Sequence, residues 1–413
     1  MTDIESALAD IRDRGLYRKL RMISGPQGPR VLLDGRPVLL LCSNNYLGLA
    51  DHPRVREAAA EAAMRYGAGA GASRLVSGNM RIHRRLEERL ADFKGYPSAL
   101  LFGSGFLANM GVIQALAKPG EVVFSDALNH ASIVDGCRIA GAETFVYDHG
   151  DVDHLAWGLR EAEGRGSLIV TDGVFSMDGD VAPLPEIVEL ARRFDARVMV
   201  DDAHGTGTVG PDGRGSVAAA GLEDEVDVLV GTLGKSLGSY GAYVCCDRPM
   251  AKYLVNTART LIFSTALGPP QVAAAMAALE LLREEPRRVE RLQRNSRILR
   301  EALAEQGLPT GGGDTPIVPV IVGDADAAVA ASERALERGV FAQAIRPPTV
   351  PDGSSRLRLT VMASHTKAEL RDAAKVVAKA VPEAARKAAA RQALEAEAAA
   401  AGGRVFDRLA DAA

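Results

Sequence analysis

The stretch that decides the fold is VDVLVGTLGKSLG, residues 226–238. Apolar side chains fill most positions from 226 to 230, which is typical of a short strand covered on both faces. The chain then turns through glycines to Lys235. Open α/β sheets bind their ligands just beyond the carboxyl ends of their strands, so this lysine is expected at a ligand site. A neutral amine there can form a Schiff base with a carbonyl group.

Two other interpretations of Lys235 compete with this one. A lysine in a glycine-rich turn is often simply solvated. The stretch also half-resembles the phosphate-binding pattern G-x-x-x-x-G-K-[ST]. That pattern requires glycine at position 229, where this chain has Leu229. The loop is therefore too short for a nucleotide cradle, and a P-loop is disfavoured.

The composition indicates a soluble globular enzyme. The chain has 413 residues, of which 47% are hydrophobic and 25% charged, and its length predicts more than one domain. A net charge of −4 argues against nucleic-acid binding. Neither a secretory leader nor an apolar run of about 18 residues is found, so no membrane is expected. The cysteines match neither a disulfide framework nor a metal site, which predicts a cytoplasmic protein without a metal: Cys42, Cys137, Cys245 and Cys246.

Strand-like and helical stretches alternate through the middle of the chain, which predicts an α/β fold with a mostly parallel central sheet. A short apolar strand near residue 99 runs into Gly103, Ser104 and Gly105 and then into a helix, whose N-terminal amides suit a phosphate. Further strands are expected at 121–126, 144–148, 167–176, 197–205, 226–232 and 241–247. Helices are expected near 132–140, 151–163, 184–194 and 248–258.

The two ends of the chain are expected to form separate parts. An amphipathic helix at 4–22 should end in a basic cluster, followed by a hairpin at 30–41 that turns at Asp34-Gly35. Helices are predicted at 53–66, 80–94 and 270–306. A smaller domain then follows, with strands at 316–322, 340–345 and 355–361 and helices at 325–338 and 366–380. The expected domains are 1–45, a large domain 46–290, a small domain 291–382, and an Ala-rich tail 383–413 that is helical or disordered.

Polar residues collect just past the ends of the predicted strands. Each has an ordinary explanation as a turn residue or a helix cap, but together they predict one polar sheet edge. The group comprises Asn129, His130, Ser176, Asp178, Asp180, Asp201, Asp202, His204, Thr232 and Lys235. A nucleophilic lysine, a carboxylate, histidines and hydroxyls are the parts that pyridoxal phosphate needs.

Several motifs between about residues 15 and 381 carry a family resemblance: SNNYLGL, LFGSGFLAN, NHASI, VFSMDGDVAPL, VDDAHGTGTVG, GTLGKSLG and IFSTALGPP. With these motifs the chain resembles the α-oxoamine synthases, a family of fold-type I pyridoxal-phosphate enzymes. The resemblance implies a large domain with a mostly parallel sheet, a smaller α/β C-terminal domain, pyridoxal 5'-phosphate as cofactor, and a homodimer.

The resemblance also implies a role for each candidate site residue. Those expected at the cofactor ring are Lys235 for the Schiff base, Asp201 facing the pyridine nitrogen, His204 at the phenolic oxygen, and His130 stacked over the ring. Those expected at the phosphate are the backbone of Gly105 and Phe106, the hydroxyls of Ser176 and Thr232, and Ser264 and Thr265 from the partner subunit. Those expected at the substrates are Arg346 at the amino-acid carboxylate, Asn45 beside it, and Arg18 near the acyl group.

The segment IRPPTVPDGSSRLRL, residues 345–359, indicates the substrates. It resembles the family member that condenses L-alanine with a pimeloyl thioester and releases carbon dioxide, a step of biotin synthesis. The sequence leaves open whether coenzyme A or acyl carrier protein bears the acyl chain. The alternatives are a relative that uses glycine and acetyl-CoA and, from another class, a P-loop nucleotide hydrolase.

Overall fold

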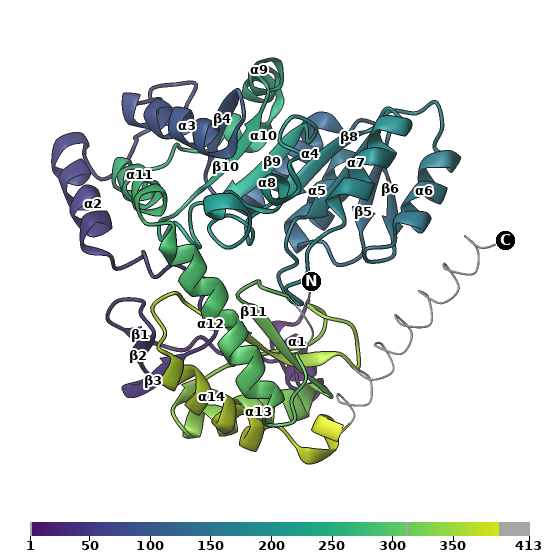
Figure 1. The fold of residues 1–413 in the computed structure, drawn as a ribbon. Coiled ribbons are helices and arrows are strands. Elements are labelled where there is room, and N and C mark those ends of the chain that lie inside the picture. The colour runs from purple at the N-terminus through teal and green to yellow at the C-terminus, as the bar shows by residue number, and fades with distance from the viewer. Residues whose placement is uncertain (1, 311–312, 388–413) are drawn as a thin grey trace, which may run out of the picture. The chain divides into compact units, whose positions relative to one another are not determined.

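The computed structural model describes residues 2–310 and 313–387. The chain divides into two units (Figure 1). One unit runs from Asn44 to Gln293, and the other combines the residues up to Ser43 with those from Arg294 onward. The prediction had kept residues 1–45 apart from the C-terminal domain; in the structure the residues up to Ser43 share a unit with the C-terminal residues, and Asn44 and Asn45 belong to the other unit. Most of the predicted Ala-rich tail, residues 388–413, lies outside the described residues.

A seven-stranded sheet forms the centre of the 44–293 unit. Its strand order is β4-β10-β9-β8-β7-β5-β6. Strand β10 runs antiparallel to both of its neighbours, and β9, β8, β7, β5 and β6 are parallel to one another, which confirms the mostly parallel sheet. The strands are β4 (Ser98–Phe102), β5 (Val122–Asp126), β6 (Glu143–Tyr147), β7 (Ser167–Asp172), β8 (Arg197–Asp201), β9 (Val228–Thr232) and β10 (Ala242–Cys246).

Helices cover this sheet, and its inner strands are buried along nearly their whole length, as their apolar runs predict. Val170, Met199 and Val230 from the strands pack in one core with Ile113 and Ile133 from the helices. The helical segments are α2 (Pro53–Tyr66), α3 (Arg81–Lys94), α4 (Gly105–Leu116), α5 (Ala131–Ala140), α6 (Val152–Glu161), α7 (Leu184–Arg193), η1 (Pro211–Gly213), α8 (Ser216–Ala220), α9 (Arg248–Thr257), α10 (Arg259–Ile262) and α11 (Pro269–Glu284).

The long helix predicted at 270–306 is wrong, because the structure has two helices there. The first, α11, ends at Glu284, and α12 runs from Arg287 to Ala304. Pro286 lies between them. Proline lacks an N–H and disfavours helical geometry in the residue before it, and Glu285 accordingly has φ −127° and ψ 61°.

The other unit contains two small sheets. In the first, strands lie in the order β1-β2-β3-β12, and in the second in the order β11-β14-β13. The elements are α1 (Ile4–Asp13), β1 (Ile23–Ser24), β2 (Arg30–Leu33), β3 (Arg36–Leu40), β11 (Ile317–Gly323), α13 (Ala325–Glu337), β12 (Val340–Phe341), β13 (Gln343–Ile345), β14 (Ser355–Thr360) and α14 (Lys367–Ala380). The strand predicted at 340–345 is therefore split between the two sheets.

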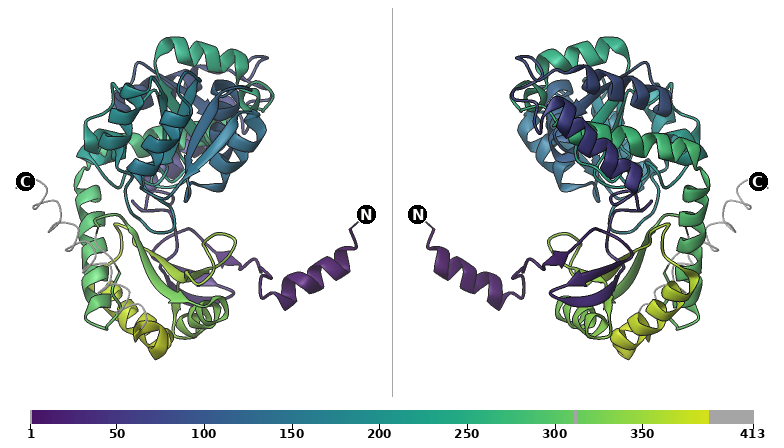
Figure 2. Two further views of the ribbon diagram at one scale, coloured as in Figure 1. Left: turned by 90° about the vertical axis from the view of Figure 1, so that its right-hand side faces the viewer. Right: turned by 90° about the vertical axis from the view of Figure 1, so that its left-hand side faces the viewer.

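The hairpin β2–β3 is confirmed, and its turn residues Asp34 and Gly35 both have positive φ, as a two-residue type I′ turn requires. Helix α1 is shorter than predicted because the chain turns at Gly15, which has φ 64° and cannot continue a helix. None of its residues is buried, and it stands clear of the other elements of its unit (Figure 2). Among the described residues, no helix has the length and apolar character needed to cross a membrane.

Candidate active site

Lys235 lies on the loop that joins the neighbouring strands β9 and β10. The loop is closed at its base, where the backbone N–H of Leu233 donates to Gly241 O at 2.9 Å. No helix follows Lys235 until α9 begins at Arg248. A P-loop requires a helix directly after its lysine, so the nucleotide-hydrolase alternative is wrong.

A chain of hydrogen bonds leads from Lys235 into the protein. Its Nζ lies 2.7 Å from His204 Nε2, and His204 Nδ1 lies 2.7 Å from the hydroxyl of Tyr46. The Tyr46 hydroxyl in turn donates to Asn44 Oδ1 at 3.1 Å. The structure thus brings together Lys235 and His204, which the sequence analysis assigned to one site. It adds Tyr46, which holds the far side of the imidazole.

Asp201 and Asp202 differ sharply in their surroundings, because successive side chains at a strand end point to opposite faces. Asp201 is 6% exposed; it accepts hydrogen bonds from Asn109 Nδ2 at 2.6 Å and Ala203 N at 2.9 Å. Within the described parts of the chain no salt bridge reaches Asp201. A buried carboxylate without a cation is costly, so this position suits a positively charged ligand group.

Asp202, by contrast, already has its cation. Its carboxylate binds Lys94 Nζ at 2.8 Å and the Ser216 hydroxyl at 2.7 Å. The backbone also closes around it, since a Cβ added to Gly205 or Gly215 would come within 1.9 or 1.7 Å of its carboxylate oxygens. Asp202 therefore has a structural environment, and Asp201 is the member of the pair suited to a ligand.

His130 and Asp172 complete the polar cluster around Asp201. His130 caps α5, and burial lowers its imidazole pKa, with the nearby Lys235 charge acting in the same direction. Asp172 is directly beside Asp201 in the register of β7 and β8. Burial, followed by the charge of Asp201, raises the pKa of Asp172 well above its ordinary value. Asp172 Oδ2 has no hydrogen-bond partner among the described residues.

The residues expected at the phosphate lie at or beyond the ends of β4, β7 and β9 and, for Ser264 and Thr265, between α10 and α11. Gly105 and Phe106 open α4, where the first N–H groups have no acceptor inside the helix. Ser176 is buried in the loop after β7, and the Thr232 hydroxyl donates to Gly241 O at 3.1 Å. Ser264 and Thr265 line a small hollow together with Gly103 and Arg74 of the same chain.

His149, which was not predicted as a site residue, links two of these loops. Its ring nitrogens lie 2.9 Å from Asp126 Oδ1 and 2.9 Å from Asp180 Oδ2. Both carboxylates can only accept, so both nitrogens must donate, and the ring is an imidazolium. These hydrogen bonds raise the pKa of His149 to about 10. Asp126 precedes the His130 turn and Asp180 closes the Ser176 loop, so His149 ties the two together.

Three further site residues were not predicted from the sequence: Asn109, Tyr46 and Asp172. Asn109 is fully buried on α4 and binds Asp201. A signal for Asn109 was present in the sequence, because it is a lone amide within the apolar helical stretch FLANMGVI. Asp172 ends β7, which was predicted to continue to residue 176, and only its neighbour on β8 reveals its significance.

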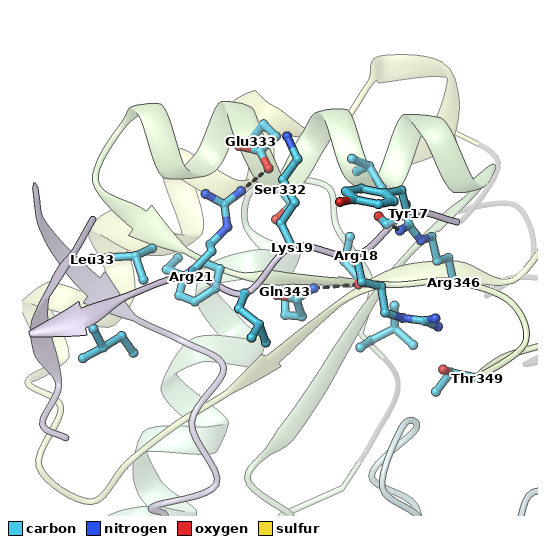
Figure 3. A pocket seen from close by; sticks show the side chains of 16 residues that line it. Tyr17, Arg18, Lys19, Arg21, Leu33, Ser332, Glu333, Gln343, Arg346 and Thr349 are labelled. Atoms are coloured by element: carbon cyan, nitrogen blue, oxygen red, sulfur yellow. Dashed lines mark hydrogen bonds and ion pairs between the residues drawn. The ribbon is translucent and has the colours of Figure 1, made fainter. Parts of the chain in front are cut away.

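Arg18 and Arg346 lie in the other unit, where they line one cavity of about 630 Å³ (Figure 3). Arg346 donates to Tyr17 O at 2.8 Å, which holds it beside the chain segment that carries Arg18. Lys19 and Arg21 line the same cavity, and Arg21 is paired with Glu333. The structure therefore brings together the two arginines that were assigned to substrates.

Two further arginines of this unit were overlooked. Arg356 and Arg358 are 5% and 6% exposed and share one face of β14. The alternation of arginine with leucine in RLRL could have indicated that both arginines lie on one face of a strand. Asn45 belongs to the 44–293 unit, where its Oδ1 accepts from Ala50 N at 3.2 Å. Its predicted place beside Arg346 stays a prediction.

The cluster in the 44–293 unit fits pyridoxal phosphate. The cofactor's pyridinium nitrogen suits the unpaired carboxylate of Asp201, and its phosphate suits the N-terminus of α4. Lys235 supplies the amine. The three features come from the ends of different strands of one sheet.

Comparisons with known proteins show the family of this chain. The aminotransferase class I and II family matches residues 36–377. The 8-amino-7-oxononanoate synthase of Geobacter sulfurreducens is 52% identical over 379 residues, covering 91% of this chain and 97% of that protein. The enzyme of that name from Lysinibacillus sphaericus is 50% identical over 357 residues, covering 86% of this chain and 92% of that protein.

Solved structures give the same result. Serine palmitoyltransferase from Sphingomonas wittichii superposes with a TM-score of 0.87 at 33% identity, covering 92% of this chain and 98% of that one. A structure of SPT with its PLP internal aldimine has the same TM-score at 34% identity and the same coverage. The 8-amino-7-oxononanoate synthase of Francisella tularensis has a TM-score of 0.72 at 26% identity, covering 83% of this chain and 97% of that one. The chain therefore belongs to the aminotransferase class I and II family and, within it, to the pyridoxal-phosphate-dependent α-oxoamine synthases.

Proposed function

We propose that this protein is an acyltransferase that condenses L-alanine with a pimeloyl thioester. The products are 8-amino-7-oxononanoate, carbon dioxide and the free thiol carrier, and the reaction is a step of biotin synthesis. The observation that carries the proposal is 52% identity, over 91% of the chain, to a relative named for this product. The cluster of Lys235, His204 and Asp201 supplies the chemistry that such a reaction requires.

Bound pyridoxal phosphate supplies an electron sink for the bond that breaks at the amino-acid α-carbon. The carboxylate of Asp201 would keep the proton on the ring nitrogen, which would make that sink effective. Lys235 Nζ would hold the cofactor and, as a free amine, would take up the α-proton of alanine. His204 Nε2, 2.7 Å from Lys235 Nζ, holds that amine in place.

The cavity of the other unit supports the substrate assignments. Arg18, Lys19, Arg21 and Arg346 make its lining strongly basic. Alanine has one carboxylate and the pimeloyl chain ends in another, so both substrates need cations. A planar guanidinium binds a carboxylate through two parallel hydrogen bonds. We assign Arg346 to the alanine carboxylate and Arg18 to the acyl group, whether coenzyme A or acyl carrier protein bears it.

We also propose that the enzyme is a homodimer in which Ser264 and Thr265 reach the partner's phosphate. Phe263 beside them is 70% exposed, and Val76 is 79% exposed on a loop that pairs with this segment. Large apolar side chains exposed together mark protein contacts.

All four cysteines are free, which supports a cytoplasmic location.

The test offers the purified enzyme alanine or glycine, each with pimeloyl-CoA or acetyl-CoA, and measures carbon dioxide and free thiol. Alanine with pimeloyl-CoA should be fastest. The preference for alanine over glycine rests on one methyl group, which is worth about 10–200-fold. The acyl preference should be larger. If glycine with acetyl-CoA is fastest, the protein is a glycine C-acetyltransferase and the proposal fails.

A further inference from the structure

A continuous path of hydrogen bonds connects Asp201 to His130. Asn109 Nδ2 lies 2.6 Å from Asp201 Oδ2 and 2.8 Å from the hydroxyl of Ser132. That hydroxyl lies 2.7 Å from His130 Nδ1. The backbone N–H of Ser132 donates to the same ring nitrogen at 3.2 Å. Asn109 and Ser132 are fully buried, so the middle of the path is shielded from solvent, whereas His130 at its end is exposed.

The first members of this path fix the positions of its hydrogens as far as Ser132. The carboxylate of Asp201 can only accept, so Asn109 must turn its NH₂ group toward it. The second hydrogen of that NH₂ points to Ser132 Oγ, which accepts it. The single hydroxyl hydrogen of Ser132 remains available to donate to His130 Nδ1. Turning the Asn109 amide over would place its oxygen against the Asp201 carboxylate, which is repulsive.

The backbone favours the same direction. The N–H of Ser132 can only donate, and its 3.2 Å contact, longer than that of the hydroxyl, adds a second donor at His130 Nδ1. A neutral imidazole with an acceptor at Nδ1 carries its proton on Nε2. The lowering of the His130 pKa by burial agrees with a neutral ring. The charged groups that face this ring are Asp201 and Lys235, whose effects on it oppose each other.

We infer that Asn109 and Ser132 are positioning residues that lock His130 as the neutral Nε2–H tautomer. His130 then offers a ligand an N–H donor at Nε2 and has no lone pair there. It cannot serve as the base of the reaction, and it suits an oxygen acceptor such as a substrate carbonyl or carboxylate. The nature of that acceptor rests on the proposed function, but the tautomer does not.

The tautomer can be observed directly. The full-length holoenzyme is labelled with ¹⁵N-histidine, and long-range ¹H–¹⁵N spectra are recorded between pH 6 and 9. The chain has seven histidines, and the signals missing in His130→Gln identify His130. We expect a protonated Nε2 and an unprotonated Nδ1 throughout. Because this spectrum of the unaltered protein needs no substitution at Asn109 or Ser132, a protonated Nδ1 overturns the inference even if the variants below fail to fold.

A matched pair of substitutions tests the role of the hydroxyl. Ser132→Thr keeps the hydroxyl and Ser132→Val removes it, while both crowd the buried site equally. The Val variant should show a mixture of tautomers and a lower kcat than the Thr variant. The two variants should melt at similar temperatures. Asn109→Leu should mix the tautomers as well. Identical His130 spectra in the Thr and Val variants would show that the hydroxyl does not set the tautomer.

The spectra separate this inference from the proposed function. If the enzyme prefers other substrates while His130 is the Nε2–H tautomer, only the proposed function fails. If the substrates are correct while Nδ1 carries the proton, only the inference fails.

Discussion

Lys94 Nζ lies 2.8 Å from Asp202 Oδ2, and both side chains are completely buried. Lys94 also donates to Arg214 O, and Asp202 accepts from Ser216. A buried ion pair is tolerated only when its remaining hydrogen-bonding groups are also satisfied. This one holds the residue that directly follows Asp201, so it fixes the strand end that carries the Asp201 carboxylate.

Lys94→Met should destabilise the fold by about 3–5 kcal/mol, because it leaves Asp202 buried without a cation. Urea denaturation of the wild type and the variant measures the difference. The control is Arg84→Met, which breaks the exposed pair Arg84–Glu88 and should cost less than about 1 kcal/mol. Equal losses in the two variants would mean that burial of the Lys94 pair has no special importance.

We expect different effects from the substitutions Asp201→Asn and Asp202→Asn, one on cofactor affinity and the other on stability. The first should weaken pyridoxal phosphate binding by about 10–150-fold, because a charge-assisted contact is worth roughly 1.5–3 kcal/mol. It should change the melting temperature of the apoenzyme little. The second should lower that melting temperature and affect cofactor affinity less. Cofactor titration and thermal melts of both variants check this, and the reverse pattern would exchange our assignments within the pair.

His149→Gln should destabilise the protein in a pH-dependent manner. Its pKa is raised from 6.5 to about 10 in the fold by hydrogen bonds to Asp126 and Asp180. The stabilisation is therefore complete below pH 6.5 and is lost as the pH rises through about 10. The gap in melting temperature between wild type and variant should be widest near pH 6 and should narrow toward pH 10.

The matched control for this prediction is His154→Gln. His154 Nδ1 accepts from the backbone N–H of Asp148 and lies 3.3 Å from the carboxylate of that one residue, so His154 does not bridge two carboxylates as His149 does. Comparing the two variants separates the loss of that bridge from the general effect of replacing a histidine. If the difference in melting temperature between the wild type and His149→Gln stays constant from pH 6 to 10, the charged state that we assign to His149 is contradicted.

Lys235→Ala should abolish turnover while the protein still folds, because Lys235 lies on a loop whose base is held by backbone hydrogen bonds. Circular dichroism and the melting temperature check the fold. Borohydride should fix the cofactor to the wild type and not to the variant. Wild-type turnover by Lys235→Ala without added amine would remove this residue from the mechanism.

Subunit mixing tests the proposed dimer. Lys235→Ala and Thr265→Asp subunits should each be inactive alone, the second because a carboxylate repels the phosphate. A mixed dimer should regain activity, since one of its two sites then has both residues intact. If no activity returns after subunit exchange is confirmed, each site is built from one chain.

The sheet and its polar edge could be predicted because they depend on local patterns. Continuous apolar runs predicted the strands, and the carboxyl ends of parallel strands meet at one edge. Asp201, His204 and Lys235 could therefore be assigned to one place. The break at Pro286 was also within reach, since proline rules predict it.

The supporting contacts could not be predicted, because they join distant parts of the chain. Lys94 is 108 residues from Asp202, and Asn109 is 92 residues from Asp201. His149 binds carboxylates 23 and 31 residues away. No rule of sequence spacing predicts contacts between residues so far apart in the chain. The strand at 340–345 was misread for a related reason: a short apolar run does not reveal which sheet each half joins.

The pairing of β3 with β12 also bears on how the protein is made. Leu39 and Leu40 lie opposite Val340 and Phe341, and the first hairpin packs in one apolar cluster with Phe341 and Met362. Ribosomes add roughly 5–20 residues per second, so the hairpin waits about 15–60 s for its partner strand to emerge. During that time the whole 44–293 unit has been synthesised, and the nascent hairpin exposes an apolar face that chaperones can recognise.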